Sequence, residues 1–277
     1  MVIKKKIDEK ESSFEGNPVT IYKDGHRTHL ITIPKKIDFF SMIEERKTSV
    51  DPQFLERKIY GTGYTFANVG VSVCLTVGVS DDNYLVLVKQ NRRDEDDEVL
   101  KLISGYVASC QRPEEAIKKE LKEELIMVKN GEYLSLDIEE ILNNKSAYLT
   151  RSIDSDKIIL DDYHLDCLGI QYCAPTNSAQ LIFGGHVQIE NVDGLSLFHA
   201  EDVFNQETRK LDVFLTDDLF LAKVKEGGID GELYKLENGL LKEVTPKEKT
   251  SLSEFFVPSK NGIITQKNIY LDSILEK

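Results

Sequence analysis

The chain contains no tryptophan, only three methionines and only four cysteines in its 277 residues. The cysteines form no CxxC pair, so the sequence predicts neither a zinc knuckle nor a redox dithiol. Unpaired thiols suit a reducing compartment, and we therefore expect a cytoplasmic protein. The first residues, MVIKKKIDEKESS, lack an apolar stretch, so a secretory signal is not expected.

Positive charge is also scarce. The chain has 35 Lys and Arg against 48 Asp and Glu, a formal net charge of −13, and no long basic tract. Such a chain gains little from duplex DNA or from an anionic membrane surface, so we expect neither as a partner. An anionic small molecule remains compatible with this charge if metal ions screen it.

Several catalytic motifs are missing as well. The sequence has no GxSxG elbow, no phosphate-binding Walker loop and no HExxH pair. These absences give no support to a serine nucleophile, a P-loop or a zinc peptidase.

The uncharged segment 60–79 has the length of a membrane span, but its pattern is that of a strand. Valine and leucine occupy the odd positions from Val69 to Val79, and small or polar residues occupy the even ones. A period of two is typical of a β-strand.

The rest of the chain predicts an α+β domain with additions at both ends. We expect a hairpin at Asp24-Gly25, partly helical residues over 38–60 with a break at Asp51-Pro52, and strands at 84–88 and 99–103. A helix over 113–128, a short one near 137–143, a strand within 169–190, a helix near 200–210 and a hairpin at Asn238-Gly239 should follow. Strands on both sides of one strong helix indicate an α/β/α layered domain with a mixed sheet over 62–200. Residues 1–61 then form an N-terminal extension with a hairpin, and 201–277 a C-terminal extension with a helix plus a hairpin.

The helix over 113–128 carries a group of carboxylates at the edge of its apolar stripe. At 100° per residue, Glu120 and Glu124 border the stripe and Glu123 lies beside them. A solvated amphipathic helix with Glu–Lys pairs is the ordinary interpretation of such a pattern. Three crowded carboxylates repel one another unless a cation lies among them, and Mg²⁺ is commonly held by a few carboxylates together with phosphate oxygens.

This segment resembles the box of the Nudix hydrolases, G-x5-E-x7-R-E-U-x-E-E-x-G-U, where U is aliphatic. Residues Gly105–Met127 match it without a gap, and agree at Gly105, Glu120, Leu121, Glu123, Glu124 and Met127. Three positions depart from it: Gln111 replaces Glu, Lys119 replaces Arg and Ile126 replaces Gly. A Gln111–Lys119 hydrogen bond would be a weaker substitute for the usual ion pair. On a helical wheel Ile126 falls on the lysine side, where the helix end must be shaped differently or covered.

The resemblance implies a Mg²⁺-dependent hydrolase, with Mn²⁺ as the alternative ion, that cleaves a nucleoside diphosphate derivative. It assigns metal binding and catalysis to Glu120, Glu123 and Glu124. The general base is then one of these glutamates or a carboxylate of the acidic loop 161–166. Arg92 and Gly105 are candidates for contacting the substrate, and Tyr172 or Phe183 for stacking on a base, although an aromatic residue in a strand is more often part of a core.

The substrate is predicted from two short segments. Gln90-Asn91-Arg92 is similar to the Gln-x-Arg of many ADP-ribose pyrophosphatases, and the segment from Gln171 to Phe183 faintly resembles the SQPWPFPxS segment of NADH pyrophosphatases. A polar turn and a proline that breaks a strand are the plainer interpretations. We expect ADP-ribose, NADH or a nucleotide sugar.

Two other hypotheses stay open. The three departures favour a Nudix-fold nucleotide-binding or regulatory protein without catalysis, whereas the retained glutamates favour an enzyme. An unrelated acidic interaction protein would have no affinity for Mg²⁺. The negative charge and the lack of a basic, aromatic-rich stripe argue against a cap-removing enzyme that acts on RNA. The flanking segments are expected to form a homodimer interface, a lid or a small separate unit.

Overall fold

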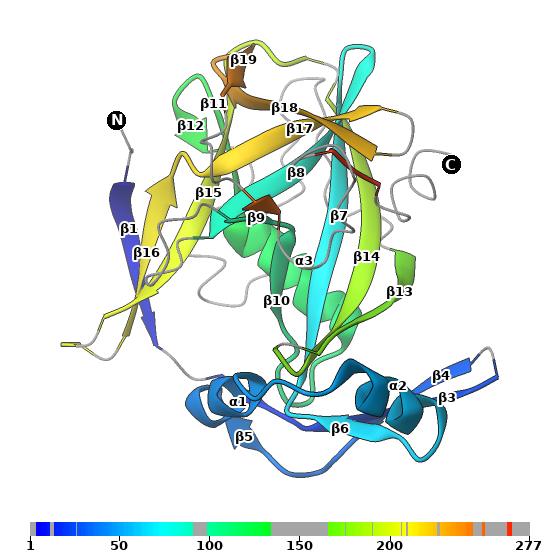
Figure 1. The fold of residues 1–277 in the computed structure, drawn as a ribbon. Helices are drawn as coiled ribbons and strands as arrows, with labels where there is room; N and C mark the ends of the chain where they lie inside the picture. Colours follow the sequence, from blue (N-terminus) through cyan, green and yellow to red (C-terminus); the bar gives the residue numbers. More distant parts are fainter. Residues whose placement is uncertain are drawn as a thin grey trace.

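The computed structural model describes twelve stretches of the chain: residues 4–11, 14–25, 27–90, 99–133, 166–174, 176–189, 191–205, 207–208, 210–225, 228–245, 251–252 and 265–267. Mixed sheets make up most of this part, and three helices accompany them (Figure 1). The helices are α1 (Phe39–Arg46), α2 (Pro52–Tyr60) and α3 (Pro113–Glu124). The α+β class is therefore confirmed, while the α/β/α layering stays a prediction.

The main sheet contains the long alternating strand β7 (Val69–Val79). Its neighbours along the sheet follow the order β13 (Asp166–Cys173), β14 (Ser178–Ile189), β7, β8 (Asp82–Gln90), β17 (Leu219–Lys225), β18 (Gly228–Glu237) and β19 (Leu240–Val244). β14 runs parallel to β7, and the remaining pairs along this order are antiparallel. The shorter strands β9 (Val99–Lys101), β10 (Ile103–Tyr106), β20 (Ser251–Leu252) and β21 (Thr265–Lys267) extend the same sheet.

A second sheet has the strand order β1 (Lys4–Glu11), β16 (Lys210–Thr216), β15 (Leu195–Phe204), β11 (Leu125–Lys129) and β12 (Glu132–Tyr133). Two small sheets belong to the N-terminal residues: β4 (Arg27–Thr32), β3 (Val19–Asp24) and β6 (Tyr64–Phe66), and the pair β2 (Glu15–Gly16) and β5 (Ile37–Asp38). In Figure 1 these N-terminal elements lie together with α1 and α2 at the lower end of the long strands.

The expected turns and helix starts are confirmed at several places. Asp24 and Gly25 end β3 at a hairpin, and Asn238-Gly239 joins β18 to β19 with φ angles of 49° and 80°. Positive φ at both central residues is the geometry that favours an Asn-Gly pair. Asp51 caps α2 by accepting a hydrogen bond from the Phe54 amide, and Pro52 begins the helix.

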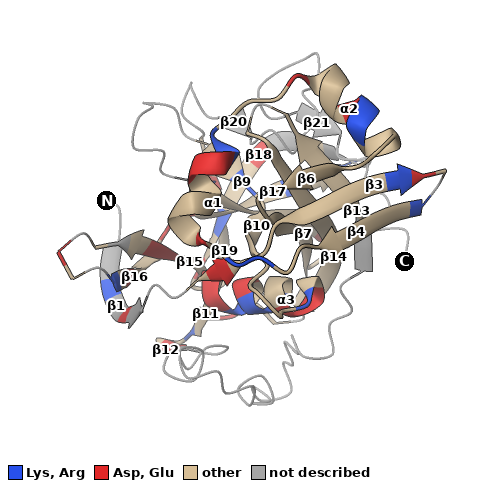
Figure 2. Cartoon of the chain, turned by 90° about the horizontal axis from the view of Figure 1, so that it is seen from below, with Lys and Arg blue, Asp and Glu red and all other residues tan. Residues whose placement is uncertain are grey.

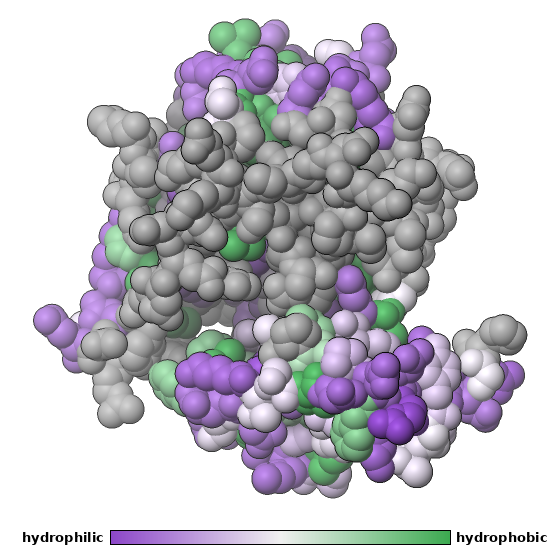
Figure 3. All heavy atoms as spheres, viewed as in Figure 1, coloured by the Kyte–Doolittle hydropathy of each residue, from purple (hydrophilic) through white to green (hydrophobic). Residues whose placement is uncertain are grey.

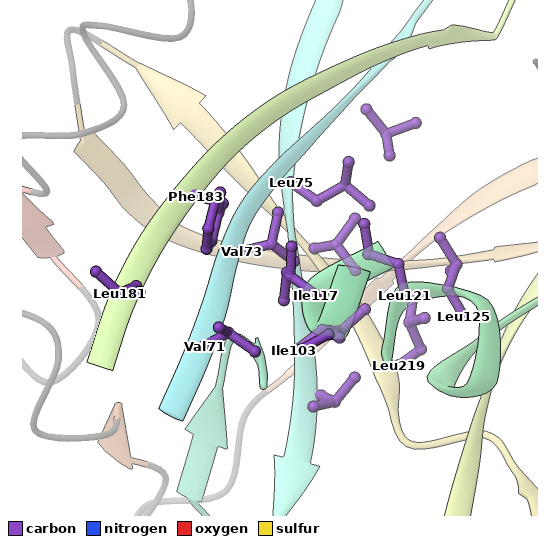
Figure 4. Close-up of a cluster of buried hydrophobic side chains, with 14 of the residues drawn as sticks. Val71, Val73, Leu75, Ile103, Ile117, Leu121, Leu125, Leu181, Phe183 and Leu219 are labelled. Atoms are coloured by element: carbon purple, nitrogen blue, oxygen red, sulfur yellow. The ribbon is translucent and has the colours of Figure 1, made fainter. Parts of the chain in front are cut away.

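The core lies between α3 and one face of the main sheet. Ile117 and Leu121 of α3 pack against the odd-numbered residues of β7 (Figure 4). Phe183 of β14 and Ile103 of β10 complete this contact and are about 1% exposed. Each such side chain contributes roughly 1.5–3 kcal/mol when it leaves water, so the buried stripe holds α3 on the sheet.

The expected end of this helix was wrong. α3 stops at Glu124, and residues 125–129 form strand β11 instead of a last helical turn. Leu125 and Met127 face the main core, whereas Ile126 joins a separate cluster with Val213 and Leu215. Successive residues that are buried on alternate sides fit a strand, in which side chains point to opposite faces in turn, and do not fit a helix. The helix-wheel position predicted for Ile126 is corrected accordingly.

Two further predicted elements differ from the structure. The single strand expected over 99–103 is divided at Leu102, because β9 pairs with β8 while β10 pairs with β7. The helix expected near 200–210 was also wrong, since strand β15 covers Leu195–Phe204 and β16 begins at Lys210. The short helix expected near 137–143 lies outside the described residues.

Strands beyond residue 200 belong to the same two sheets as the predicted central domain. β17 pairs with β8, and β16 pairs with both β15 and β1. The domain division at 61 and 200 stays a prediction. No helix among the described residues is long and apolar enough to cross a membrane.

Candidate functional site

The candidate site is built on helix α3. Pro113 opens the helix, and Glu115 accepts a hydrogen bond from the Arg112 amide at 3.2 Å, which satisfies one of the free amides of the first turn. Glu120, Glu123 and Glu124 follow in the last two turns, and all three are partly buried. Figure 2 shows acidic and basic segments side by side along α3.

Gly105 and Glu120 are in direct contact in the fold, although they are fifteen positions apart in the sequence. Gly105 lies on β10 opposite Val71, on the side of the sheet that α3 covers. A Cβ atom built on Gly105 would lie 2.1 Å from Cδ and 2.2 Å from Oε1 of Glu120. The carboxyl group therefore occupies the space that any other residue at position 105 would need.

The other two glutamates have basic neighbours. Lys119 Nζ lies 3.6 Å from Glu123 Oε1, and the Glu123 side chain is 14% exposed against 51% for Lys119. His199 Nε2 lies 3.8 Å from Glu124 Oε2. The expected Gln111–Lys119 hydrogen bond is not made: Gln111 Oε1 accepts from the Ala108 amide instead, at 3.2 Å.

Sequence reasoning assigned no role to His199. It is 5% exposed, and its Nδ1 has no hydrogen-bond partner within the described residues. The β11–β15 ladder places it directly opposite Leu125, the residue after Glu124. Nothing in the local sequence signals this neighbour, because the two residues meet only when β15 pairs with β11.

The chemistry of the three side chains fits a hard divalent cation. Carboxylate oxygens are the ligands that Mg²⁺ takes, often one or two of them with substrate phosphates completing the shell. Among the described residues, however, no three His, Cys, Asp or Glu side chains form a group that could hold a metal ion, so Glu120, Glu123 and Glu124 are not gathered around one position in this structure.

The candidate substrate contacts lie at different places. Gly105 is beneath Glu120, as described above. Arg92 and the acidic residues 161–165 lie outside the described residues, as does the side chain of Asp166. Phe183 is a core residue at 1% exposure.

Tyr172 is packed in the fold. Its ring stacks on Phe66 with centroids 6.0 Å apart and an interplanar angle of 15°, and Lys23 Nζ lies 5.7 Å from its centroid. Burial, with a smaller contribution from Tyr60, raises the pKa of Tyr172 to about 12. Its role in substrate binding stays a prediction.

Comparisons with known proteins give only distant likenesses. No family model matches the chain, and no curated protein matches it. Two similar solved structures are a MutT/nudix family protein from Enterococcus faecalis and an ADP compounds hydrolase. The first shares 10% identity at a TM-score of 0.29, and the match covers 66% of this chain. This chain spans about 56% of the length of that protein. The second shares 11% identity at a TM-score of 0.24, with 72% of this chain and 76% of the other covered. Likenesses this distant decide neither fold nor function.

Proposed function

We propose that the chain is a Mg²⁺-dependent hydrolase of the Nudix type that cleaves the diphosphate bond of a nucleoside diphosphate derivative. ADP-ribose, NADH and nucleotide sugars are the favoured substrates. The contact between Gly105 and Glu120 carries this proposal, because it gives a physical reason for the glycine that begins the box and the glutamate that it accommodates. Lys119 lies 3.6 Å from Glu123 and His199 lies 3.8 Å from Glu124, so each of the other two glutamates has a basic neighbour.

Within this proposal, each group of residues would have a separate role. Glu120, Glu123 and Glu124 would hold the ion, with Mn²⁺ as the alternative to Mg²⁺. When bound, the ion supplies charge neutralisation for the diphosphate and makes water more acidic. A carboxylate accepts the proton as water adds to phosphorus and the P–O bond to the leaving phosphate breaks. That base is a box glutamate or a carboxylate of the loop 161–166.

A nucleotide-binding protein without catalysis is the second candidate. It is favoured by the absence of a three-ligand metal group in the described part of the chain, and by Ile126, which lies in a buried strand. Both candidates predict nucleotide binding, so only turnover separates them.

The experiment is the release of mononucleotide from ADP-ribose, NADH, nucleotide sugars, diadenosine polyphosphates and capped RNA, with Mg²⁺ or with EDTA. The test variant is Glu124→Gln, and the matched control is Glu114→Gln, an exposed glutamate in the first turn of the same helix. We expect cleavage of one substrate class that EDTA abolishes, that Glu124→Gln lowers at least 100-fold, as removal of one catalytic group typically does, and that Glu114→Gln leaves unchanged. A folded protein that cleaves none of them would support the binding protein.

A further inference from the structure

A row of residues crosses four neighbouring strands on the face of the main sheet that α3 does not cover. Gln171 of β13 lies opposite Gln180 of β14, Gln180 lies opposite Gly70 of β7, and Gly70 lies opposite Tyr106 of β10. Register partners point to the same face of a sheet, and successive residues alternate. Gly105 faces Glu120 on α3, so Tyr106 and its partners face the other way. We call these four residues the glutamine row.

Gln180 is held in a fixed orientation at the centre of this row. It is 6% exposed, and its Oε1 accepts a hydrogen bond from the Ser72 hydroxyl. A Cβ atom on Gly70 would lie 2.9 Å from Gln180 Cγ and 3.0 Å from Nε2, so the side chain lies over the glycine. The bond to Ser72 orients the amide, and its N–H groups are directed along the row as donors.

The two ends of the row carry buried polar atoms that have no hydrogen-bond partner within the described residues. At one end the atom is Oε1 of Gln171, an acceptor. At the other end the atom is Nη1 of Arg46, whose guanidinium lies on the ring of Tyr106 with Cζ 4.7 Å from the centroid. An unmade hydrogen bond at a buried atom is costly, and each such atom in a native fold calls for an explanation.

The N-terminal elements fix Arg46 in this position and border the row at both ends. Arg46 is in the last turn of α1, and the chain then continues to Val50, whose amide donates to the Ala174 carbonyl at 2.9 Å. The Asn177 side chain also donates to the Glu45 carbonyl at 3.5 Å. The segment that begins beside Tyr106 therefore ends beside the turn that follows β13. In Figure 3 the lower part of the viewed face, around α1 and α2, mixes hydrophilic and hydrophobic residues.

We propose that the glutamine row and Arg46 bind a nucleoside monophosphate on the face of the main sheet opposite α3, apart from the glutamates that would hold the ion. Arg46 supplies a guanidinium for a phosphate oxygen, and the amides of Gln171 and Gln180 supply an acceptor and donors for the hydrogen-bonding edge of the base. Strands about 4.8 Å apart set the ends of the row roughly 14 Å apart, a length that suits a mononucleotide and exceeds that of inorganic phosphate. The choice of ligand rests on the proposed function.

The test is a calorimetric binding titration of the full chain in EDTA, where no metal contributes. The probes are AMP, GMP, CMP and UMP, the matching nucleosides, and inorganic phosphate. The variants are Arg46→Met and Gln171→Leu. Their matched controls are Arg57→Met and Gln53→Leu on the exposed face of α2. Thermal unfolding of each variant shows that it is folded.

We expect at least one mononucleotide to bind the unchanged chain. Arg46→Met should weaken that binding about tenfold or more while leaving the nucleoside unaffected, because only the phosphate contact is lost. Gln171→Leu should lower the preference among the four bases about tenfold and leave phosphate binding unchanged. The controls should bind as the unchanged chain does.

Failure of this inference differs from failure of the proposed function. Mg²⁺-dependent cleavage with mononucleotide affinities that neither variant alters would overturn the binding site and leave the hydrolase standing. Mononucleotide binding that Arg46→Met weakens and whose base preference Gln171→Leu lowers, in a chain that cleaves nothing, would uphold the binding site and remove the hydrolase. Folded protein that binds no mononucleotide in EDTA would overturn the inference directly.

Discussion

Gly105 shows how a single missing side chain can determine where a carboxylate lies. A methyl group at this position would fall 2.1 Å from Glu120 Cδ, but it would meet the far end of a movable side chain and not the backbone. We therefore expect Gly105→Ala to displace the Glu120 carboxyl at a modest stability cost of about 1–3 kcal/mol. Its loss of Mg²⁺-dependent cleavage should approach that of Glu120→Gln.

Steady-state kinetics of the two single variants and the double variant check this prediction. If both changes act through the same carboxyl group, adding Gly105→Ala to Glu120→Gln should lower activity little further. Ser104→Ala, a change at the preceding residue on the other face of β10, is the control. Full activity of Gly105→Ala would contradict the prediction.

Tyr172 allows a test of burial at the same scale. Its hydroxyl is buried without a hydrogen-bond partner in the described part of the fold, so Tyr172→Phe should leave stability unchanged or raise it by about 1 kcal/mol. The folded-state pKa of about 12 is above the ordinary value of 10. The folded form thus holds this proton more tightly than the unfolded form, and its contribution to stability is complete below pH 10 and is lost as the pH rises toward 12.

Urea unfolding between pH 8 and the alkaline limit measures this difference. The stability of the unchanged chain should fall faster above pH 10 than that of Tyr172→Phe. Equal slopes for the two proteins would show that Tyr172 ionises as readily in the fold as in the unfolded chain.

At the scale of the element, the residue that departs from the Nudix box at the junction of α3 and β11 is also a buried residue that should stabilise the fold. Position 126 is glycine in the Nudix box and isoleucine here, and Ile126 is 1% exposed among Ala200, Val213 and Leu215. Restoring the glycine removes a buried side chain and adds backbone freedom to a strand. We expect Ile126→Gly to cost about 3–5 kcal/mol and Ile126→Val about 0.5–1.5 kcal/mol, both measured by denaturant unfolding. A glycine variant as stable as the unchanged chain would mean that this residue is not part of a packed strand.

The same junction illustrates what could be predicted from the sequence. The alternation over Val69–Val79 and the turn at Asn238-Gly239 depend on local chemistry, and both were confirmed. The end of α3 depends on β15 and β16, which cover Ile126, and no local pattern contains that information. A helical wheel and a strand both place Leu125 in the core, so the error came from a real ambiguity in a short apolar run.

The candidate site divides in the same way. Glu120, Glu123 and Glu124 could be proposed from the sequence because they occur on one helix at a fixed spacing, and their role stays a prediction. His199 and Arg46 could not be proposed in this way, because His199 lies near Glu124 only through the pairing of β15 with β11, and Arg46 lies beside Tyr106 only through the packing of α1. An isolated arginine in a segment of mixed composition carries no local signal in the sequence. Only the register of four strands shows that Gln171, Gln180 and Tyr106 form one row.

At the scale of the whole molecule, the predicted central domain over residues 62–200 is joined through its sheets to strands that follow residue 200. Leu219 and Leu221 of β17 are at most 1% exposed, belong to the main core, and lie on the strand that pairs with β8. A fragment of residues 62–200 would lose this strand and leave β8 with an open edge, which favours association over folding. We expect the fragment to lack a cooperative thermal transition by circular dichroism and to be degraded quickly by protease, whereas the full chain unfolds cooperatively. A fragment of 62–225, which retains β16 and β17, should recover part of that cooperativity, and a stable 62–200 fragment would instead establish the predicted domain as an independent folding unit.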